Sequence, residues 1–317
     1  MDRSRTVSIA SSFLLLLAFA LAGPAAAEDI SGTIATTKFL TEDSRLVGNV
    51  TCTTTTEPCI DLAASNITLR LNGFTITGPA DPDAGVCNAT SGLPQADGIR
   101  TMNVTNVRIV GPGMVQKFRR HGIFIVGQTN IRTQATVSDI TSHHNCFSGI
   151  FTNTMSSSRI EGIVSIRNAI QSGAAPCGGN CLVNSHNNVI RRNFFAGNGS
   201  AANNNNDFGV GLIGTSSGNL IEDNSIGGNS NGLLLQATAR GNLIRLNVIA
   251  GNPPSQFSKD YGASIGADVK DEATTNGARN TFDRNGCVTY LGPGPAPCTN
   301  LPRLDPSFIA PADSALP

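Results

Sequence analysis

The side chains suited to acid–base chemistry are concentrated between positions 97 and 145. This stretch holds three of the four histidines, with cations and carboxylates between them: Asp97, Arg100, Lys117, Arg119, Arg120, His121, Asp139, His143 and His144. A histidine or carboxylate can remove a proton, and an arginine or lysine can neutralise a neighbouring negative charge. Removing the proton beside the carboxyl group of a uronic acid needs both functions.

Five of these residues are the candidate catalytic residues: Asp97, Arg119, Arg120, His121 and His143. A lyase or epimerase would use His121 or His143 as the base and Arg119 or Lys117 as the neutralising cation. A glycoside hydrolase would instead need two carboxylates across the glycosidic bond, and Asp97, Asp139 and Glu161 are the carboxylates nearby. We predict neither a cofactor-binding residue nor a metal ligand, although a lyase would be compatible with calcium.

The alternative interpretation is a set of polar turns. Asp97-Gly98 is ordinary turn chemistry, and Arg119-Arg120-His121 has the composition of a link between two strands. His143-His144 stands directly before Asn145 and fits an exposed turn equally well. The spacing of these residues is compatible with both interpretations.

Two repeated patterns indicate the elements that would hold these residues. The first is Asn-x-φ-x-x-Asn, where φ is apolar, at 188–193, 219–224, 242–247 and 280–285. The second is a glycine followed by an apolar strand, at Gly98, Gly122, Gly149, Gly209, Gly232 and Gly262, with a weaker member at Asn180-Cys-Leu-Val183. Such spacings of about 23–30 residues are typical of a solenoid, and no convincing helical period lies between the strands.

The fold class that these patterns predict is all-β, a right-handed parallel β-helix of about eight coils with inserted loops. One inward column would be Ile99, Ile123, Ile150, Val210 and Leu233, and another Ile190, Ile221, Ile244 and Phe282. Asn193, Asn224, Asn247 and Asn285 would form a turn ladder, because asparagine tolerates left-handed backbone angles and its amide can bond along the stack.

Two further columns should face outward. Arg191, Glu222, Arg245 and Asp283 alternate in sign and are expected to form a solvated stripe. Arg100, Phe124, Phe151 and Leu234 would make a largely apolar column. An apolar column needs cover, for which we expect an inserted loop or the proline-rich tail.

The composition indicates the compartment in which the protein works and limits the partners that it can bind. Residues 1–27 have the basic start, apolar centre and Ala25-Ala-Ala27 cleavage site of a signal peptide. Removing Arg3, Arg5 and Asp2 leaves 20 basic and 21 acidic residues without a basic cluster, so nucleic acid is excluded as a partner. We expect a secreted or periplasmic monomer without a membrane span after cleavage. The predicted domains are 1–27 signal peptide, 28–47 N-terminal cap, 48–290 β-helix and 291–317 proline-rich tail.

The eight cysteines all lie in the mature chain, which fits an oxidising compartment. Proximity in the sequence favours three local pairs, Cys52–Cys59, Cys177–Cys181 and Cys287–Cys298, and leaves Cys87 for Cys146. A metal site at Cys177-Gly-Gly-Asn-Cys181 is disfavoured, because no second ligand pair stands at zinc-like spacing.

The repeats resemble those of the secreted right-handed parallel β-helix (PbH1) proteins of the pectate-lyase-like superfamily, from about Cys52 to Cys298. The segments that carry the resemblance are Asn66-Ile-Thr-Leu-Arg-Leu-Asn72-Gly-Phe-Thr-Ile-Thr-Gly78, Asp97-Gly-Ile and Asn106-Val-Arg-Ile-Val-Gly111. The resemblance implies an action on polysaccharides, since the superfamily holds lyases, polygalacturonases, pectin esterases and uronan C5-epimerases. The chain lacks the paired aspartates and Gly-His-Gly of polygalacturonases and the Asp-Pro-His-Asp of alginate epimerases. Asp81-Pro-Asp83, its nearest carboxylate pair, is interpreted as a loop turn.

The leading hypothesis is an exported β-helix that binds or modifies an extracellular polysaccharide, with lyase or C5-epimerase chemistry on uronates as its sharpest form. The alternative is a non-catalytic structural or adhesive solenoid at the cell surface, which the sparse charge and the absence of Trp favour. A periplasmic metal-handling β-helix is disfavoured by the four scattered histidines.

Overall fold

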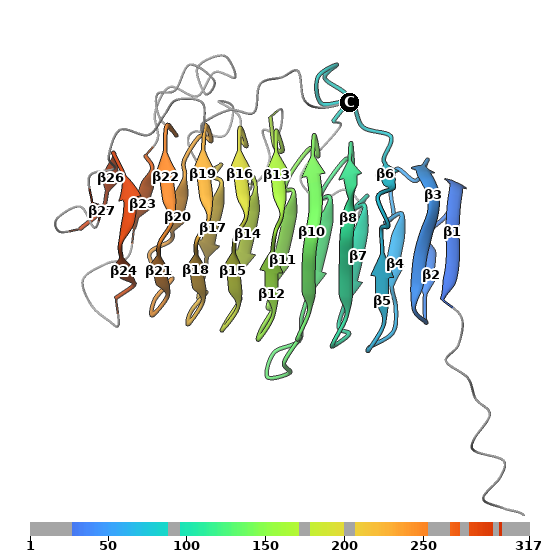
Figure 1. Cartoon of the computed structure of the whole chain (residues 1–317), viewed down its shortest axis with the longest axis horizontal. Coiled ribbons are helices and arrows are strands. Elements are labelled where there is room, and N and C mark those ends of the chain that lie inside the picture. Colours follow the sequence, from blue (N-terminus) through green and yellow to red (C-terminus); the bar gives the residue numbers. More distant parts are fainter. Residues whose placement is uncertain are drawn as a thin grey trace, which may run out of the picture.

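The computed structural model describes residues 27–87, 96–170, 178–199, 207–252, 267–272, 279–293 and 298–299. Every regular element within these ranges is a β-strand, and the strands wind into one long stack of coils (Figure 1). Over the same ranges, no helix is long and apolar enough to cross a membrane.

One face of the solenoid is a parallel sheet of ten strands, one from each coil. In spatial order they are β2 (Lys38–Leu40), β4 (Ile60–Leu62), β7 (Ile99–Met102), β9 (Ile123–Val126), β11 (Ile150–Asn153), β14 (Asn180–Val183), β17 (Val210–Ile213), β20 (Leu233–Leu235), β23 (Val269–Asp271) and β26 (Tyr290–Leu291). Their order in space is their order in sequence, which is the topology of a chain that turns once per strand. The right-handed parallel β-helix predicted from the repeats is confirmed.

The second sheet contains 17 parallel strands and covers the remaining sides of each coil. It begins with four long strands and two short ones, β1 (Glu28–Ile34), β3 (Ser44–Cys52), β5 (Thr68–Arg70), β6 (Thr75–Thr77), β8 (Arg108–Gln116) and β10 (Thr136–His143). It continues with pairs of short strands, β12 (Arg159–Glu161), β13 (Val164–Ile166), β15 (Val189–Arg191), β16 (Phe194–Ala196), β18 (Leu220–Glu222), β19 (Ser225–Gly227), β21 (Leu243–Arg245), β22 (Val248–Ala250), β24 (Thr281–Asp283), β25 (Asn285–Cys287) and finally β27 (Cys298–Thr299).

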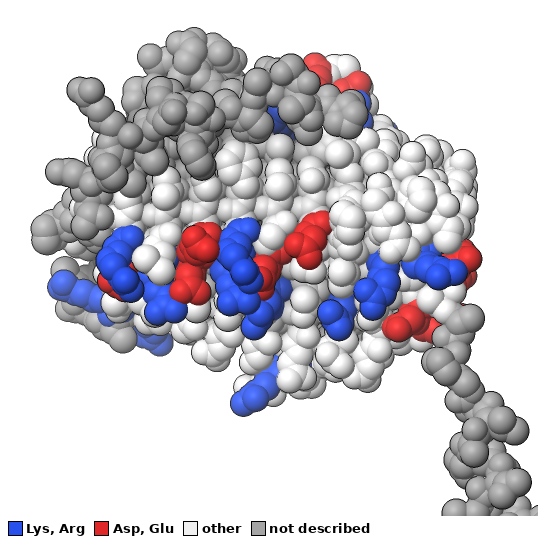
Figure 2. Space-filling view, in the orientation of Figure 1, with Lys and Arg blue, Asp and Glu red and all other residues white. Residues whose placement is uncertain are grey.

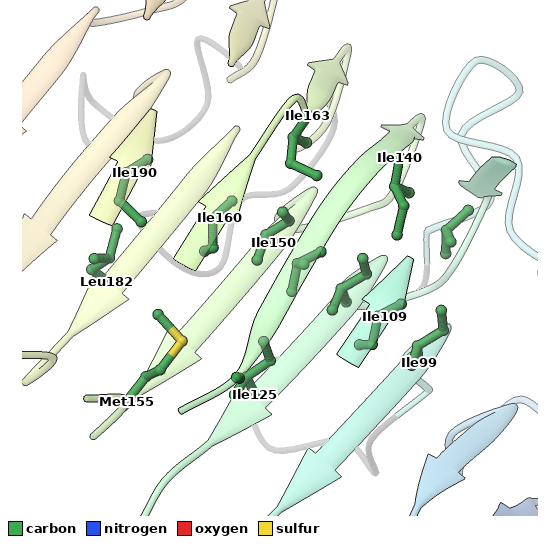
Figure 3. Close-up of a cluster of buried hydrophobic side chains, with 14 of the residues drawn as sticks. Ile99, Ile109, Ile125, Ile140, Ile150, Met155, Ile160, Ile163, Leu182 and Ile190 are labelled. Carbon is green, nitrogen blue, oxygen red and sulfur yellow. The ribbon is translucent and has the colours of Figure 1, made fainter. Parts of the chain in front are cut away.

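The core consists of continuous columns of aliphatic side chains inside the coils (Figure 3). Ile99, Ile123, Ile150, Val210 and Leu233 are all fully buried and occupy the same position in successive strands. Ile190, Ile221 and Ile244 form the second predicted column, with Phe282 half-buried at its end. Both inward columns are therefore confirmed, and the stack is stabilised chiefly by burial of these apolar surfaces.

The asparagines of the repeat form ladders inside the turns. Each motif is one short strand framed by two asparagines, and the side-chain amide of Asn193 donates to Asn224, that of Asn224 to Asn247 and that of Asn247 to Asn285, each over 2.9 Å. The predicted ladder is confirmed, but the backbone reason given for it was wrong. The left-handed residue is the one before each asparagine: Arg192, Asp223, Leu246 and Arg284. That turn points the asparagine side chain inward, where the amide is needed as a hydrogen-bonding group.

Two further asparagine ladders run parallel to this one. We did not predict them from the sequence. One joins Asn188, Asn219, Asn242 and Asn280, and the other joins Asn145, Asn168, Asn198, Asn229 and Asn252. The second of these ends on Asp268, whose carboxylate accepts from Asn252. An acceptor-only side chain can close such a ladder because nothing beyond it needs a donor.

Three details differ from the sequence prediction. The described part contains ten coils rather than about eight, because the first and last coils lack the glycine–apolar pattern that was counted. The rung after β20 is β23, whose first residue Val269 follows Asp268, while the expected Gly262 strand lies outside the described residues. Residues 28–47, expected as a cap, supply β1, β2 and the start of β3 to the same parallel sheets.

The predicted charged stripe lies on the surface across successive coils, with blue and red groups alternating along the molecule (Figure 2). Glu161 extends the stripe by one coil and pairs with Arg191, with Nε 3.0 Å from the carboxylate. Arg245 pairs with Glu222 at 2.6 Å, and Arg284 with Asp283 at 3.1 Å. These partly exposed pairs contribute about 0–1 kcal/mol each, so the stripe is a solvated structural feature.

Three of the four predicted disulfides are formed: Cys52–Cys59, Cys87–Cys146 and Cys287–Cys298. Cys181 is also disulfide-bonded, while Cys177, its expected partner, lies outside the described residues. Disulfides persist in oxidising compartments, which fits an extracellular protein.

Candidate functional site

Three of the five candidate residues meet at one corner of the solenoid, just before the strands of the ten-stranded sheet. Asp97 precedes β7 and His121 precedes β9, so the two occupy equivalent places in neighbouring coils. The backbone N–H of His121 donates to Asp97 Oδ1 over 3.2 Å, and Arg120 Nη1 lies 3.6 Å from Asp97 Oδ2. Asp97 and His121 each precede a Gly-Ile pair, and this equivalent place in neighbouring coils brings the groups together.

The corner is buried, and burial controls its charges. Asp97 is fully buried and His121 is 4% exposed, whereas the side chain of Arg120 is 25% exposed. Burial raises the pKa of Asp97 to about 6, against the opposing effect of the Arg120 charge. Burial, assisted by Arg120, lowers the pKa of His121 well below its usual value, so this imidazole is neutral. Its Nδ1 accepts the backbone N–H of Ser148 at 3.3 Å, which leaves the proton on Nε2.

Aromatic rings surround His121. Its ring stacks on Phe124 at 5.4 Å and lies 4.5 Å from Phe151 and 5.8 Å from Phe147, while the guanidinium of Arg120 lies 4.6 Å above Phe124. Phe124 belongs to the outward column for which cover was predicted, and it is only 5% exposed. The turn residues before β9 and β11 thus supply part of that cover, which we had expected from an inserted loop or the proline-rich tail.

The same outward column is covered further along by another turn residue. Phe208 precedes β17 and packs with Cys181 and Leu234 in a small cluster on the outer face of the coils. Gly211 lies beneath it, and a Cβ at Gly211 would come within 2.2 Å of the Phe208 ring. A glycine is therefore required at this rung for the ring to lie flat on the sheet.

Asp97, His121 and Ser148 have the residue types of a hydrolytic triad but not its geometry. In a triad the carboxylate accepts from the imidazole N–H and the imidazole accepts from the serine hydroxyl. Here Asp97 accepts from the backbone of His121, and the backbone N–H of Ser148 donates to the imidazole. The arrangement is a buried polar stack, and it does not activate a serine.

Arg119 and His143 lie apart from this stack. Arg119 is half-buried and its Nε has no hydrogen-bond partner within the described structure. His143 ends β10 on the other sheet and belongs to a second polar cluster. There its Nδ1 lies 2.6 Å from Nδ1 of His144, and its Nε2 lies 2.9 Å from Met114 Sδ.

The second cluster is closed by a tethered loop. The loop at 81–87 places Asp83 Oδ2 3.2 Å from His144 Nε2, and the Cys87–Cys146 disulfide holds this loop against the coil. Burial, with further effects from His144, Lys117 and Arg167, lowers the pKa of His143 to about 4. Burial also lowers the pKa of His144, against the effect of Asp83.

A polar groove at another corner was not predicted. It has a volume of about 680 Å³ and lies where the ten-stranded sheet turns into the larger sheet. Its lining is Gln128, Thr129, Asn130, Ile131, Arg132, Thr154, Ser156, Ser157, Asn184, His186, Asn187 and Thr215. Ser156, His186 and Ser217 form bridges in successive coils, and the loop 127–133 makes one wall. The signal that could have located the groove is the extra length of the coil between Val126 and Thr136.

The groove is rich in hydrogen-bonding groups and has one formal positive charge. Arg132 is exposed and makes no ion pair with the described residues, and no carboxylate lines the groove. His186 Nδ1 lies 2.9 Å from Ser217 Oγ, and Asn184 Oδ1 accepts from the hydroxyl of Thr215 at 3.2 Å. Across the described ranges, no group of three or more His, Cys, Asp or Glu converges in a way that could hold a metal ion.

Comparison with known proteins places the fold. No protein-family model and no curated protein matches the sequence of this chain. Among solved structures, the Dettilon tailspike protein superposes with a TM-score of 0.56 at 16% identity, covering 81% of this chain and 54% of that protein. Pectate lyase Pel9A superposes with a TM-score of 0.52 at 14% identity, covering 80% of this chain and 69% of the lyase. The chain thus spans about half the length of the tailspike protein that it matches. By its fold, this protein is a right-handed parallel β-helix, the fold that it shares with the Dettilon tailspike protein and pectate lyase Pel9A.

Proposed function

We propose that this protein binds an extracellular polysaccharide in the groove between Gln128 and Thr215. The observation that carries the proposal is the lining of the groove. Ligand pockets of about 300–1,000 Å³ are usually lined mostly by apolar side chains, whereas this groove of 680 Å³ has Ile131 as its one aliphatic lining residue. Amides, hydroxyls and an imidazole suit a ligand covered with hydroxyl groups.

The direction of the groove also suits a polymer. Its lining residues come from successive coils, since Thr154 follows β11, Asn184 follows β14 and Thr215 lies just after β17. Coils stack at about 4.8 Å, so equivalent hydrogen-bonding groups recur at a short regular interval along the molecule. A linear chain of sugars presents hydroxyls at a comparable interval.

The charge of the groove favours an acidic polysaccharide. Arg132 is the formal positive charge, and its guanidinium can bind a carboxylate in two parallel hydrogen bonds. A uronic acid supplies that carboxylate together with hydroxyls for Asn184 and His186. We therefore expect polyuronates to bind more tightly than neutral polysaccharides of the same length.

The test is a binding titration of the full chain with a polyuronate and a neutral polysaccharide at low salt. Arg132→Gln should weaken polyuronate binding about fivefold, as expected for an exposed ion pair of roughly 1 kcal/mol, and leave neutral binding unchanged. Arg159→Gln is the matched control, because Arg159 is also exposed but does not line the groove and pairs with Glu161 of the charged stripe. Equal losses in both variants, or no binding of either polymer, would contradict the proposal and return the chain to the structural or adhesive interpretation.

A second candidate function is lyase or C5-epimerase chemistry on uronates at the corner of Asp97, Arg120 and His121. It is supported by Asp97, whose pKa of about 6 suits a general base, and by Arg120 beside it as the partly exposed cation. Arg119 and His143, the other two residues predicted for this role, lie apart from this corner and are not part of the proposal. Substrate would meet Arg120 first, because Asp97 and His121 are buried.

This chemistry is tested separately from binding. Incubation with polyuronates, with and without calcium, is followed by the ultraviolet absorbance of unsaturated ends and by NMR of the sugar configuration. Loss of activity in Asp97→Asn and Arg120→Gln, but not in Arg132→Gln at saturating substrate, would support the corner as the active site. Polymer binding without either product would leave the protein as a binding module.

A further inference from the structure

The turn that lines the groove continues past its end. Ser156, His186, Ser217 and Arg240 are joined by parallel bridges in that order, one residue from each successive coil. Ser156 and His186 line the groove, and Thr215, its last lining residue, belongs to the same coil as Ser217. Equivalent residues of stacked parallel coils lie about 4.8 Å apart, with their side chains on the same side. Arg240 therefore lies one coil beyond the groove, in line with its floor.

Arg240 differs from the other arginines in its part of the stack. Between Ile150 and Ala250 the chain has six arginines and no lysine. Five of them pair with a carboxylate: Arg159, Arg191 and Arg192 with Glu161, Arg167 with Asp83, and Arg245 with Glu222. Arg240 is exposed and makes no ion pair with the described residues. Its guanidinium is therefore available to an anion from outside the chain.

The turn beside Arg240 carries little bulk. Gly218 follows Ser217 and Gly241 follows Arg240, both with left-handed backbone angles (φ 65° and 64°). A Cβ at Gly241 would meet no atom of the described residues within 4 Å. The equivalent places inside the groove carry a serine and an asparagine. The end of the row is thus more open than its middle, which suits a linear ligand that leaves the groove toward Arg240.

Arg132 stands at the opposite end of the same row. Its loop joins the row through Gln134, whose backbone N–H donates to the carbonyl of Ser156 over 3.1 Å. The step to Ser156 and the three bridges from there to Arg240 add up to about 19 Å along the stack. The side chains at the bridges between the two arginines are Ser156, His186 and Ser217, and none is a carboxylate. The row thus has a guanidinium at each end and hydrogen-bonding groups between them.

We propose that Arg240 is a second carboxylate-binding residue of the polysaccharide site, which then takes an acidic segment of about five sugars between Arg132 and Arg240, one sugar for each coil spacing. This inference rests on the function proposed for the groove and adds the length and charge spacing of the ligand. Each guanidinium can bind a uronate carboxylate in two parallel hydrogen bonds. Between them, His186 Nδ1 and Ser217 Oγ lie 2.9 Å apart and meet the hydroxyls of the inner sugars.

The test is a calorimetric titration of the full chain, with its disulfides intact, using oligouronates of increasing length at low salt. The affinity should rise about fivefold once the oligomer is long enough to reach Arg240, as expected for one exposed ion pair. Arg240→Gln should remove this step and leave the affinity for the shortest oligomers unchanged. Arg132→Gln should instead weaken binding at every length, and neutral oligomers should show no step at all.

Arg245→Gln is the matched control, because Arg245 belongs to the same coil but pairs with Glu222 on the charged stripe. This variant should keep the step. A step that persists in Arg240→Gln, or that Arg245→Gln removes equally, would overturn the inference, while an effect of Arg132→Gln at every length would still support binding in the groove. Absence of binding at every length would overturn the proposed function together with this inference.

Discussion

At the scale of single residues, the asparagine ladders show why one amide recurs in turn after turn. Asn224 uses its full hydrogen-bonding capacity: its oxygen accepts from the backbone and side chain of Asn193, and its NH₂ group donates to Asn247 and to the carbonyl of Ile190. These groups are buried, so each would be costly to leave unpaired. No other side chain offers donors and acceptors in that geometry.

Replacing Asn224 by aspartate should therefore be strongly destabilising. The carboxylate loses both donors and faces two acceptors, Asn247 Oδ1 and the Ile190 carbonyl. We expect a loss of about 2–5 kcal/mol in the free energy of unfolding, measured by denaturant titration. Asn103→Asp, at an exposed left-handed position, is the control and should change stability little. A similar loss in both variants would show that the ladder is not the cause.

Asp97 should make stability depend on pH in a defined window. Its pKa rises from 3.8 to about 6 on folding, so the stability associated with its protonated form is fully present below about pH 4 and is lost as pH rises through 6. Two units correspond to roughly 3 kcal/mol. Asp97→Asn imitates the protonated form, so it should equal the wild type near pH 4 and exceed it in stability above pH 6.

The measurement is the melting temperature of both proteins from pH 4 to pH 8. Subtracting the two curves removes the opposite trend expected from His121, whose lowered pKa costs stability as pH falls below about 6.5. Asp283→Asn, at an exposed carboxyl, should run parallel to the wild type. A difference between Asp97→Asn and wild type that stays constant with pH would exclude this assignment.

At the scale of elements, one short strand shows how the coil divides its work. In β18, Ile221 points into the core and Glu222 points to the charged stripe, although the two are adjacent in sequence. The inner residue is fully buried and the outer one pairs with Arg245 in solvent. Two adjacent residues of one strand therefore stabilise the stack in different ways, the inner one by burial in the core and the outer one by an ion pair at the surface.

Substitutions in this strand should separate the two contributions. Ile221→Ala leaves a cavity in a close-packed column and should cost about 2–5 kcal/mol. Glu222→Gln should cost about 0–1 kcal/mol, and that cost should shrink further in high salt. Chemical denaturation at low and high salt measures both. A larger loss for Glu222→Gln than for Ile221→Ala would mean that the stripe, and not the core, stabilises the stack.

At the scale of the whole molecule, stability is distributed along one dimension. Each coil contacts chiefly its two neighbours, so an interior coil has two interfaces and an end coil within the described part has one. The end strands β1 and β27 are also sheet edges in this part of the chain. The groove and the Met114–His143 cluster both involve interior coils, where the backbone that supports them is most protected.

Amide hydrogen exchange should follow this distribution. We expect the slowest exchange in β14, β15 and their neighbours, and exchange at least tenfold faster in β1, since local opening of an end coil breaks a single interface. Mass spectrometry of proteolytic peptides during exchange measures the profile. Uniform protection from β1 to the central coils would show that the stack unfolds only as one unit.

The elements were predictable because a solenoid repeats its signals. Ile190, Ile221 and Ile244 recur at the same place in the motif, and a column of aliphatic residues with period-two strands has few alternative folds. The candidate corner was half predictable for the same reason: Asp97 and His121 stand at equal places in adjacent coils. The sequence could not show that His143 lies away from Asp97 and His121, because a turn of a few residues decides which sheet a side chain joins.

The sequence by itself determined the solenoid, its inward columns and most of its disulfides, since these depend on spacing along a regular repeat. Only the tertiary structure decided which polar residues are buried, which rings cover the outer face and where a groove opens. Asp97 and Arg132 look alike in sequence, as charged residues in turns. Their environments differ because neighbouring coils enclose the first and a longer loop leaves the second in solvent, and no local pattern encodes what lies across the stack.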